Sequence, residues 1–313
     1  MHILITGSAG FIASHLVEHI LSLGHTITGI DNFITGSKKN IANSLKNPAF
    51  HFIENDILTF DYSSITQPID IVFHMASPAS PIQYKKHPFE TLQVNSVGTQ
   101  QALEFATEKK AILVFASTSE VYGDPLVHPQ VEWYWGNVNP NGVRSCYDEA
   151  KRFGEAMCMT YVRTKNTQVR IARIFNTYGP RMDVDDGRVI SNFIVQALKN
   201  EPITLYGTGE QTRSFCYVSD LVLGLWALAT KELKTGEVIN LGNPNEMTIS
   251  EIAHKIKIAT HSTSEFIKKP IELDDPSKRK PDISKAKELL EWEPVVPIDE
   301  GLNKTIEYFQ SII

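Results

Sequence analysis

Tyr147 and Lys151 are two side chains whose types and spacing could do chemistry. The run from Ser145 to about Lys165 predicts a helix, and residues four apart on a helix lie one turn above each other on the same face. A free tyrosine has a pKa of about 10 and is a poor base at neutral pH, but a nearby cation favours its ionised form. The pair therefore suits removal of a proton from a hydroxyl group while a hydride leaves the same carbon. A surface Tyr/Lys pair has the same spacing, so the rest of the chain must decide.

A possible partner for this pair follows a predicted strand at residues 111–116. That strand leads into Ser117-Thr118-Ser119-Glu120. Where such a strand lies beside a Tyr-x-x-x-Lys helix, Thr118 can hold the hydroxyl that Tyr147 deprotonates. The three side chains together predict an oxidation site for an alcohol.

A glycine-rich turn follows the first predicted strand, at residues 2–6. The spacing is G-x-x-G-x-x-A over residues 7–13, and a helix to about Leu23 comes next. Strand, glycine turn and helix form the context of a dinucleotide-binding fingerprint, in which a pyrophosphate lies at the helix N-terminus. We therefore expect a dinucleotide at Gly7 and Gly10.

Two acidic residues end the next two predicted strands. Asp31 lies 21 positions after Gly10, where an acid accepts the adenosine ribose hydroxyls. An acid there repels a 2′-phosphate, which favours NAD over NADP, although Lys38 and Lys39 lie nearby. For Asp56, at the end of the third strand, hydrogen bonding to adenine and capping of a turn both stay open.

Apolar runs and helical patterns alternate along the first half of the chain. Further strands are predicted at 70–76 and 168–175, with a long helix from Pro88 to about Glu108. This order predicts an α/β fold with a doubly wound, Rossmann-like parallel sheet. After Asn176 the segments become shorter and richer in glycine and proline, which predicts a smaller C-terminal substrate-binding domain. The expected NAD-binding domain is 1–177 with a return segment at about 216–244, and the substrate-binding domain is 178–215 and 245–313.

Composition excludes several classes of function. The 313 residues are 42% hydrophobic, so the chain is globular, and the net charge of −6 gives no electrostatic reason for nucleic-acid binding. No apolar run approaches the roughly 20 residues that span a bilayer. The three cysteines form neither a metal-spaced cluster nor an even disulfide set, and no signal peptide precedes the first strand. We expect no metal and no membrane, and a reducing, cytoplasmic location.

With these motifs in place, the chain resembles the extended short-chain dehydrogenases/reductases that modify sugar nucleotides. More narrowly it is similar to the UDP-glucuronic acid decarboxylases, or UDP-xylose synthases. Ala13 and Ala150 depart from the family pattern, but neither change removes a reactive group. The segments that carry the narrower resemblance are MASPASP from Met75, STSEVYGDPLVHPQ from Ser117, YWGNVNPNGVRSCYDEAKR from Tyr134, RIARIFNTYGPRM from Arg170, DGRVISNFIVQAL from Asp186, YGTGEQTRSFCYVSDL from Tyr206 and DDPSKRKPDI from Asp274.

The resemblance implies a closed redox cycle on UDP-glucuronate. Bound NAD oxidises carbon 4, the carboxylate on carbon 5 leaves as carbon dioxide, carbon 5 is protonated, and the hydride returns to carbon 4 to give UDP-xylose. Tyr147, Lys151 and Thr118 act at carbon 4, and Glu120 with Ser119 around carbon 5. Arg279 could bind the substrate carboxylate as a bidentate partner, across the site from Ser119 and Glu120, or it could lie in a solvated loop. The resemblance also implies a homodimer.

The binding residues implied by the same resemblance fall into two sets. For NAD they are Gly7, Gly10, Phe11, Ile12, Asp31, Asn32, Phe33, Thr35, Gly36, Asp56, Ile57, Met75, Ser77, Val94, Ala116, Tyr147, Lys151 and Thr177. For the nucleotide sugar they are Pro78, Tyr84, Thr118, Glu120, Tyr147, Asn176, Arg188, Ser191, Asn192, Tyr206, Gln211, Arg213 and Arg279.

Three other functions stay open. A 4,6-dehydratase often carries Asp-Glu where this chain has Ser119-Glu120, but GDP-mannose dehydratases resemble Thr-Ser-Glu here. A 4-epimerase usually lacks a glutamate at position 120. A non-catalytic NAD-binding sensor or scaffold would predict damage to Thr118, Tyr147 or Lys151, and the sequence shows none.

Overall fold

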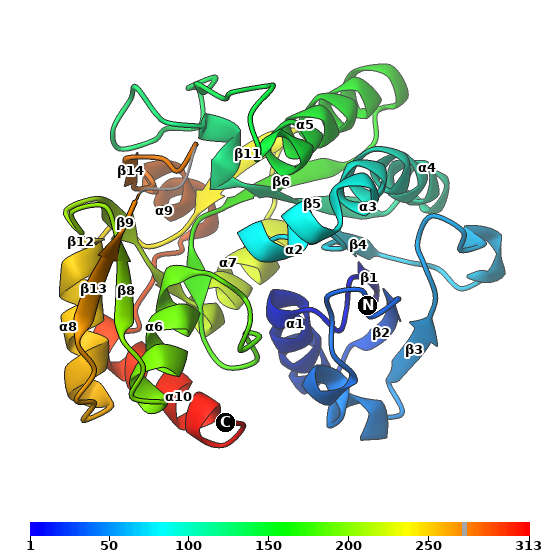
Figure 1. Ribbon diagram of the computed structural model, residues 1–313. Helices are drawn as coiled ribbons and strands as arrows, with labels where there is room; N and C mark the ends of the chain where they lie inside the picture. The colour runs from blue at the N-terminus through cyan, green and yellow to red at the C-terminus, as the bar shows by residue number, and fades with distance from the viewer. Residues whose placement is uncertain (271–273) are drawn as a thin grey trace.

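Seven short apolar runs form one parallel sheet at the centre of the molecule (Figure 1). The computed structural model describes residues 1–270 and 274–313. Strands rich in β-branched side chains suit this position because both faces of a parallel sheet are buried. In spatial order the strands are β11 (Glu237–Leu241), β6 (Val169–Ile174), β5 (Ile112–Thr118), β4 (Ile71–His74), β1 (His2–Thr6), β2 (Thr26–Asp31) and β3 (Phe50–Glu54).

Helices cover both faces of this sheet. On one face α1 (Phe11–Ser22) packs against α7 (Val218–Thr230), and on the other α4 (Thr99–Lys109) packs against α5 (Ser145–Lys165). Successive strand residues point to opposite faces, so Ile3 and Ile5 belong to one core cluster and Leu4 to the other. The strand order and the two helical layers confirm the expected doubly wound, Rossmann-like sheet.

Near the carboxyl ends of the strands, the structure differs from the sequence prediction in two elements. β5 continues through Thr118, so this residue ends the strand instead of following it. The predicted long helix is divided into α3 (Pro88–Gln93), a π-helical turn (Val94–Gly98) and α4. The Asn95 amide in this turn donates to the Thr91 carbonyl and to Ser77 Oγ, both within 2.9 Å. A π-turn with this side-chain contact ties the helix to the loop after β4, and such turns are frequent at functional sites.

Short strands and three helices form a separate layer beside the large sheet (Figure 1). Thr248 and Glu251 form a capping box that fixes the start of α8. The elements are β8 (Ile203–Tyr206) paired with β13 (Phe266–Lys269), β9 (Thr212–Ser214) between β12 (Glu246–Thr248) and β14 (Lys278–Arg279), and the helices α6 (Val189–Leu198), α8 (Ile249–Ala259) and α10 (Ile298–Gln310).

Two short helices and one pair of strands complete the α-helices and strands that the structure describes. They are α2 (Pro81–Lys86), β7 (Thr177–Tyr178) paired with β10 (Cys216–Tyr217), and α9 (Ser284–Leu290), which packs on α7 and β11. None of the helices that the structure describes has the length and apolar character needed to cross a membrane.

Candidate active site

A cavity of about 620 Å³ lies at the carboxyl ends of the central strands. Residues that follow β1, β4, β5 and β6 line it, among them Gly7, Met75, Glu120 and Asn176. A smaller cavity of about 90 Å³ adjoins it, since both share Gly7 and Met75 in their walls. Ligands of open α/β sheets bind at this edge, so the two cavities are the candidate site.

Most residues predicted for the site line one of these cavities. In the large cavity are Gly7, Gly10, Phe11, Ile12, Thr35, Met75, Ser77, Tyr84, Ala116, Thr118, Ser119, Glu120, Tyr147, Lys151, Asn176, Thr177, Arg188, Asn192, Tyr206, Gln211 and Arg213. In the small cavity are Asp31, Asn32, Gly36, Asp56, Ile57, Pro78 and Val94.

Phe33, Ser191 and Arg279 line neither cavity, and their predicted ligand contacts stay predictions. The Phe33 amide donates to Asp31 (2.8 Å), so this residue holds the carboxylate in place. Ser191 is fully buried in the first turn of α6, where its hydroxyl donates to the Arg188 carbonyl. Arg279 lies behind Glu120, as described below.

The turn after β1 fits a dinucleotide. Gly7 has a φ of 70°, and a Cβ atom there would lie 2.7 Å from Ala76 Cα, so only glycine allows this close approach of the backbone. Gly10 is the N-cap of α1, and Phe11 and Ile12 of its first turn line the large cavity. The Asp31 carboxylate accepts hydrogen bonds from the amides of Ala9 (2.9 Å) and Phe33 and lines the small cavity, although burial raises its pKa.

The sequence left two roles open for Asp56, hydrogen bonding to adenine and capping of a turn, and the structure shows the capping. Its carboxylate accepts hydrogen bonds from the Leu58 amide (2.9 Å) and from Asn32 Nδ2 (3.0 Å), so it caps the turn after β3. It also lines the small cavity.

Tyr147 and Lys151 lie on one face of α5, as the spacing predicts, and both are buried. Lys151 Nζ donates to the Ala116 carbonyl (2.8 Å) and lies 5.9 Å from the centre of the Tyr147 ring. That ring stacks on Tyr84 with 5.0 Å between ring centres. Backbone hydrogen bonding and stacking thus fix both side chains at the end of β5.

Burial has opposite effects on the pKa values of this pair. It lowers the pKa of Lys151 to about 7 and raises the pKa of Tyr147 above its ordinary value, against hydrogen bonding by Thr118 and the charge of Arg188. We expected a tyrosine that ionises readily. In the protein alone, the loss of hydration raises the pKa of Tyr147 more than the nearby cation lowers it. In the protein as described, the phenol therefore keeps its proton at neutral pH.

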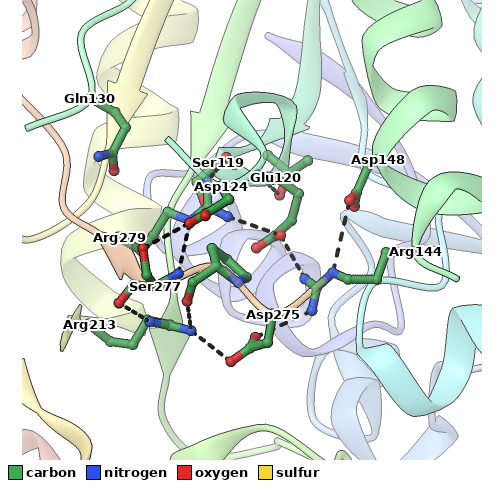
Figure 2. Close-up of polar contacts among 12 residues, drawn as sticks. Ser119, Glu120, Asp124, Gln130, Arg144, Asp148, Arg213, Asp275, Ser277 and Arg279 are labelled. Atoms are coloured by element: carbon green, nitrogen blue, oxygen red, sulfur yellow. Dashed lines mark hydrogen bonds and ion pairs between the residues drawn. The ribbon is translucent and has the colours of Figure 1, made fainter. Parts of the chain in front are cut away.

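Glu120 lies between two arginines (Figure 2). Thr118 Oγ1 accepts a hydrogen bond from the Glu120 amide (3.2 Å), which fixes the turn that brings this side chain to the cavity. Its carboxylate is 2.6 Å from Arg144 Nη2 and 3.2 Å from Arg279 Nη2. Burial acts to raise the pKa of Glu120, but Arg279, Arg144 and Arg213 together lower it to about 2. Glu120 is therefore a carboxylate at neutral pH.

The sequence suggested two places for Arg279, one across the site from Ser119 and Glu120 and one in a solvated loop. The structure places it in neither. It is 1% exposed, so it does not lie in a solvated loop. It donates to the Ser119 carbonyl and pairs with Glu120, so the expectation that these residues lie across the site from it was wrong. The reason is that β14 pairs with β9 and so brings the C-terminal segment against the end of β5.

Three charged residues of this cluster had no role in the sequence analysis. Arg144 lines the large cavity three residues before Tyr147, a spacing that places the two on one side of a helix and could have identified it. Asp275 bridges Arg144 (3.5 Å) and Arg213 (2.9 Å). Burial and the charge of Glu120 raise the pKa of Asp148 to about 8. Asp275 offered no local signal, since its partners lie far along the chain, whereas Asp148 follows its neighbour Arg144 by four residues, a helical spacing that was visible in the sequence.

Histidine, cysteine and carboxylate side chains do not gather into a metal site in the part of the chain that the structure describes: it contains no group of three or more that could hold an ion. Its three cysteines are free.

Comparison with known proteins places this site in a family. The NAD dependent epimerase/dehydratase family matches residues 3–242. UDP-glucuronic acid decarboxylase 1 of Xenopus tropicalis is 52% identical over 99% of this chain and 72% of its own length. UDP-glucuronic acid decarboxylase 2 of Arabidopsis thaliana is 51% identical over 99% of this chain and 68% of its own.

Solved structures agree with this placement. The UDP-glucuronic acid 4-epimerase of Bacillus cereus, in complex with UDP-glucuronic acid and NAD, is 33% identical, with a TM-score of 0.92 over the whole of both chains. The chain belongs to the NAD-dependent epimerase/dehydratase family and, within it, to the UDP-glucuronic acid decarboxylases.

Proposed function

We propose that the protein converts UDP-glucuronate to UDP-xylose and carbon dioxide. The observation that carries this proposal is the meeting of Thr118, Tyr147 and Lys151 with the ion-paired Glu120 in one cavity. An alcohol-oxidising group beside a fixed carboxylate matches a reaction that first oxidises carbon 4 and then acts at carbon 5. The activity that names the similar decarboxylases supports the same reaction.

NAD is the cofactor for which the glycine turn and Asp31 are suited. We assign the pyrophosphate to the turn at residues 7–13, the adenosine ribose to Asp31, and the nicotinamide side to Tyr147 and Lys151. When bound, NAD supplies the acceptor and later the donor of the carbon 4 hydride. The first domain, 1–177 with 216–244, would hold it, and the remaining segments would cover the nucleotide sugar through residues such as Tyr206 and Arg213.

The protein's own groups move the protons. Tyr147, positioned by Thr118, takes the proton of the carbon 4 hydroxyl and later returns it. Once carbon 4 is a ketone, the bond between carbon 5 and the carboxylate breaks and its electrons enter the carbonyl, so carbon dioxide leaves with little further help. One proton must then be added at carbon 5. Glu120 is ionised in the free protein, so we propose that it holds the water or acid that supplies this proton.

The test of the proposed function is release of carbon dioxide from UDP-glucuronate by the purified protein with NAD. We expect one carbon dioxide and one UDP-xylose for each substrate consumed, with no net NADH. Formation of UDP-galacturonate without carbon dioxide would instead indicate a 4-epimerase. Absence of any turnover with NAD bound would favour a sensor or scaffold.

We also propose a homodimer formed through α3, the π-helical turn and α5. These elements pack side by side (Figure 1) and leave apolar side chains exposed, with Phe89 at 75% and Phe153 at 52%. A two-fold axis would place each such face against its copy.

The three free cysteines support a reducing, cytoplasmic location.

Light scattering at micromolar concentration should give twice the monomer mass for the wild type and the monomer mass for Phe89→Glu with Phe153→Glu. Two buried charges facing their copies would each oppose association. Val295→Glu, which changes an equally exposed apolar residue outside this face, is the matched control and should stay dimeric. A monomeric wild type would contradict the proposal.

A further inference from the structure

Three arginines and three carboxylates meet at one edge of the large cavity (Figure 2). The three arginines differ in whether they line this cavity. Arg279 is fully buried and lines neither of the two cavities described above, whereas Arg144 and Arg213 both line the large one. A negatively charged ligand can therefore contact Arg144 or Arg213 directly, but it can reach Arg279 only through Glu120.

Arg213 already has partners for most of its donors. Its guanidinium donates to the carbonyls of Thr212 (2.9 Å) and Pro276 (2.6 Å) and to Asp275 (2.9 Å). These contacts hold the loop before β14. Arg213 is thus fixed mainly by the protein itself.

Arg144 has donors to spare. Within the described residues its side chain makes one hydrogen bond, to Glu120, while Asp275 (3.5 Å) and Asp148 (3.9 Å) lie beyond close contact. Its Nε is buried without a hydrogen-bond partner in the part of the chain that the structure describes. A guanidinium carries five N–H donors, and donors left without partners in a buried site call for a ligand or water.

The balance of charge at this edge also favours an anion. Oδ1 of Asp148 is buried and has no hydrogen-bond partner among the described residues. Burial and Glu120 raise the pKa of Asp148 to about 8, which favours its protonated form near neutral pH. Of the carboxylates paired with the three arginines, Glu120 and Asp275 then carry the negative charge, so the ion pairs are richer in cations.

The place of Arg144 at the N-cap of α5 suggests which anion it contacts. It precedes Tyr147 by three residues, and both line the same cavity. In the substrate of the proposed function, the carboxylate is attached to carbon 5, which is bonded to carbon 4, and the proposed mechanism brings the carbon 4 hydroxyl to Tyr147. We infer that Arg144 binds the uronate carboxylate and selects it over a neutral hexose, while Arg279 positions Glu120 from behind. This inference rests on the proposed function and replaces the sequence-based assignment of the carboxylate to Arg279.

The test measures binding to NAD-loaded protein by calorimetry in a Tyr147→Phe background, which prevents turnover. The ligands are UDP-glucuronate, UDP-glucose and UDP-xylose, which differ only in the group on carbon 5. Loss of a hydrogen-bonded charge contact predicts that Arg144→Gln weakens UDP-glucuronate binding about 10- to 100-fold. Binding of the other two ligands should change little. Arg163→Gln, the same change at an exposed position on α5, is the control.

Equal weakening of all three ligands, or an unchanged preference for UDP-glucuronate, overturns the role of Arg144. Should Arg144→Gln fail to fold, Arg144→Lys decides: a reduced preference supports the inference and an unchanged one overturns it, because an ammonium group cannot make the planar two-point contact. If the protein with Arg144 intact shows no preference for UDP-glucuronate, the proposed function itself fails. The two failures are therefore distinguishable.

Discussion

Replacing Tyr147 with phenylalanine should slow the first oxidation at least a hundredfold, by about 10²–10⁴-fold, while leaving substrate binding intact. The variant keeps the ring, and hence its stacking on Tyr84, and loses only the hydroxyl. General acid–base groups contribute on the order of 10²–10⁴-fold, and we expect the rate of carbon 4 oxidation to fall by a factor in that range. The measurement is single-turnover absorbance of NADH after mixing NAD-loaded protein with UDP-glucuronate.

Tyr161→Phe provides the matched control for this experiment. It removes a hydroxyl from the same helix, but one that contacts Glu104 outside the cavity, so the rate should not change. Formation of enzyme-bound NADH by Tyr147→Phe at the wild-type rate would refute the role of Tyr147 as the base.

Arg279→Ala should greatly slow the release of carbon dioxide, although Arg279 does not line the cavity. The variant leaves the Ser119 carbonyl without its buried donor and removes the largest of the three charge effects that keep Glu120 ionised. Loss of a charged hydrogen bond predicts a decrease of about 10- to 100-fold. Arg279→Lys should recover little of the rate, because one ammonium cannot serve both acceptors with the geometry of a guanidinium. Trapped carbon dioxide in a single turnover gives the rate.

A pH profile separates positioning by Arg279 from a general loss of structure. The pKa of Glu120 lies at about 2, well below its ordinary value, so its contribution to stability is complete above the ordinary pKa and is lost as the pH falls through about 2. Without Arg279 the pKa should rise, and the acid limb of carbon dioxide release should move to higher pH. Lys278→Ala, a change at the exposed neighbour, should leave both rate and profile unchanged. Release at the wild-type rate by Arg279→Ala would contradict the assignment.

Arg279→Ala also requires a check of stability. Breaking a buried ion pair by removing one partner can cost about 3–5 kcal/mol. Thermal unfolding of the variant with NAD bound shows whether the slower release comes from a folded protein. A variant that binds NAD and UDP-glucuronate normally but releases carbon dioxide slowly is the expected result.

The sequence was sufficient for the large sheet because each of its strands is a short apolar run beside a turn or a helix. Burial on both faces leaves a direct record in the residue types, as at Ile3, Leu4 and Ile5. The same holds for Tyr147 and Lys151, whose relation depends only on helical geometry. Strand ends were less certain, since the polar Thr118 belongs to β5 although its side chain is of a type common in turns.

The positions of Arg279 and Asp275 could not be derived from local patterns. β14 has only two residues, too few for an alternation of polar and apolar side chains to be recognised, and its partner β9 lies more than sixty residues earlier. Glu120 and Arg279 are 159 residues apart in the chain. Their contact depends on how the two layers meet, which no single segment encodes. Arg144 is different, because its spacing from Tyr147 was visible in the sequence.

The pairing of β14 with β9 brings a short C-terminal segment to a site that is built mainly on the large sheet. The large sheet, its glycine turn and the Tyr147 helix carry the groups proposed for alcohol oxidation, while a C-terminal segment of a few residues adds Arg279 and Asp275 to the charges around Glu120. We therefore expect substitutions at Asp275 and Arg279 to change the later steps of the reaction more than the oxidation. For an engineer, this short segment is the first place to seek a different fate of the 4-keto sugar on an unchanged sheet.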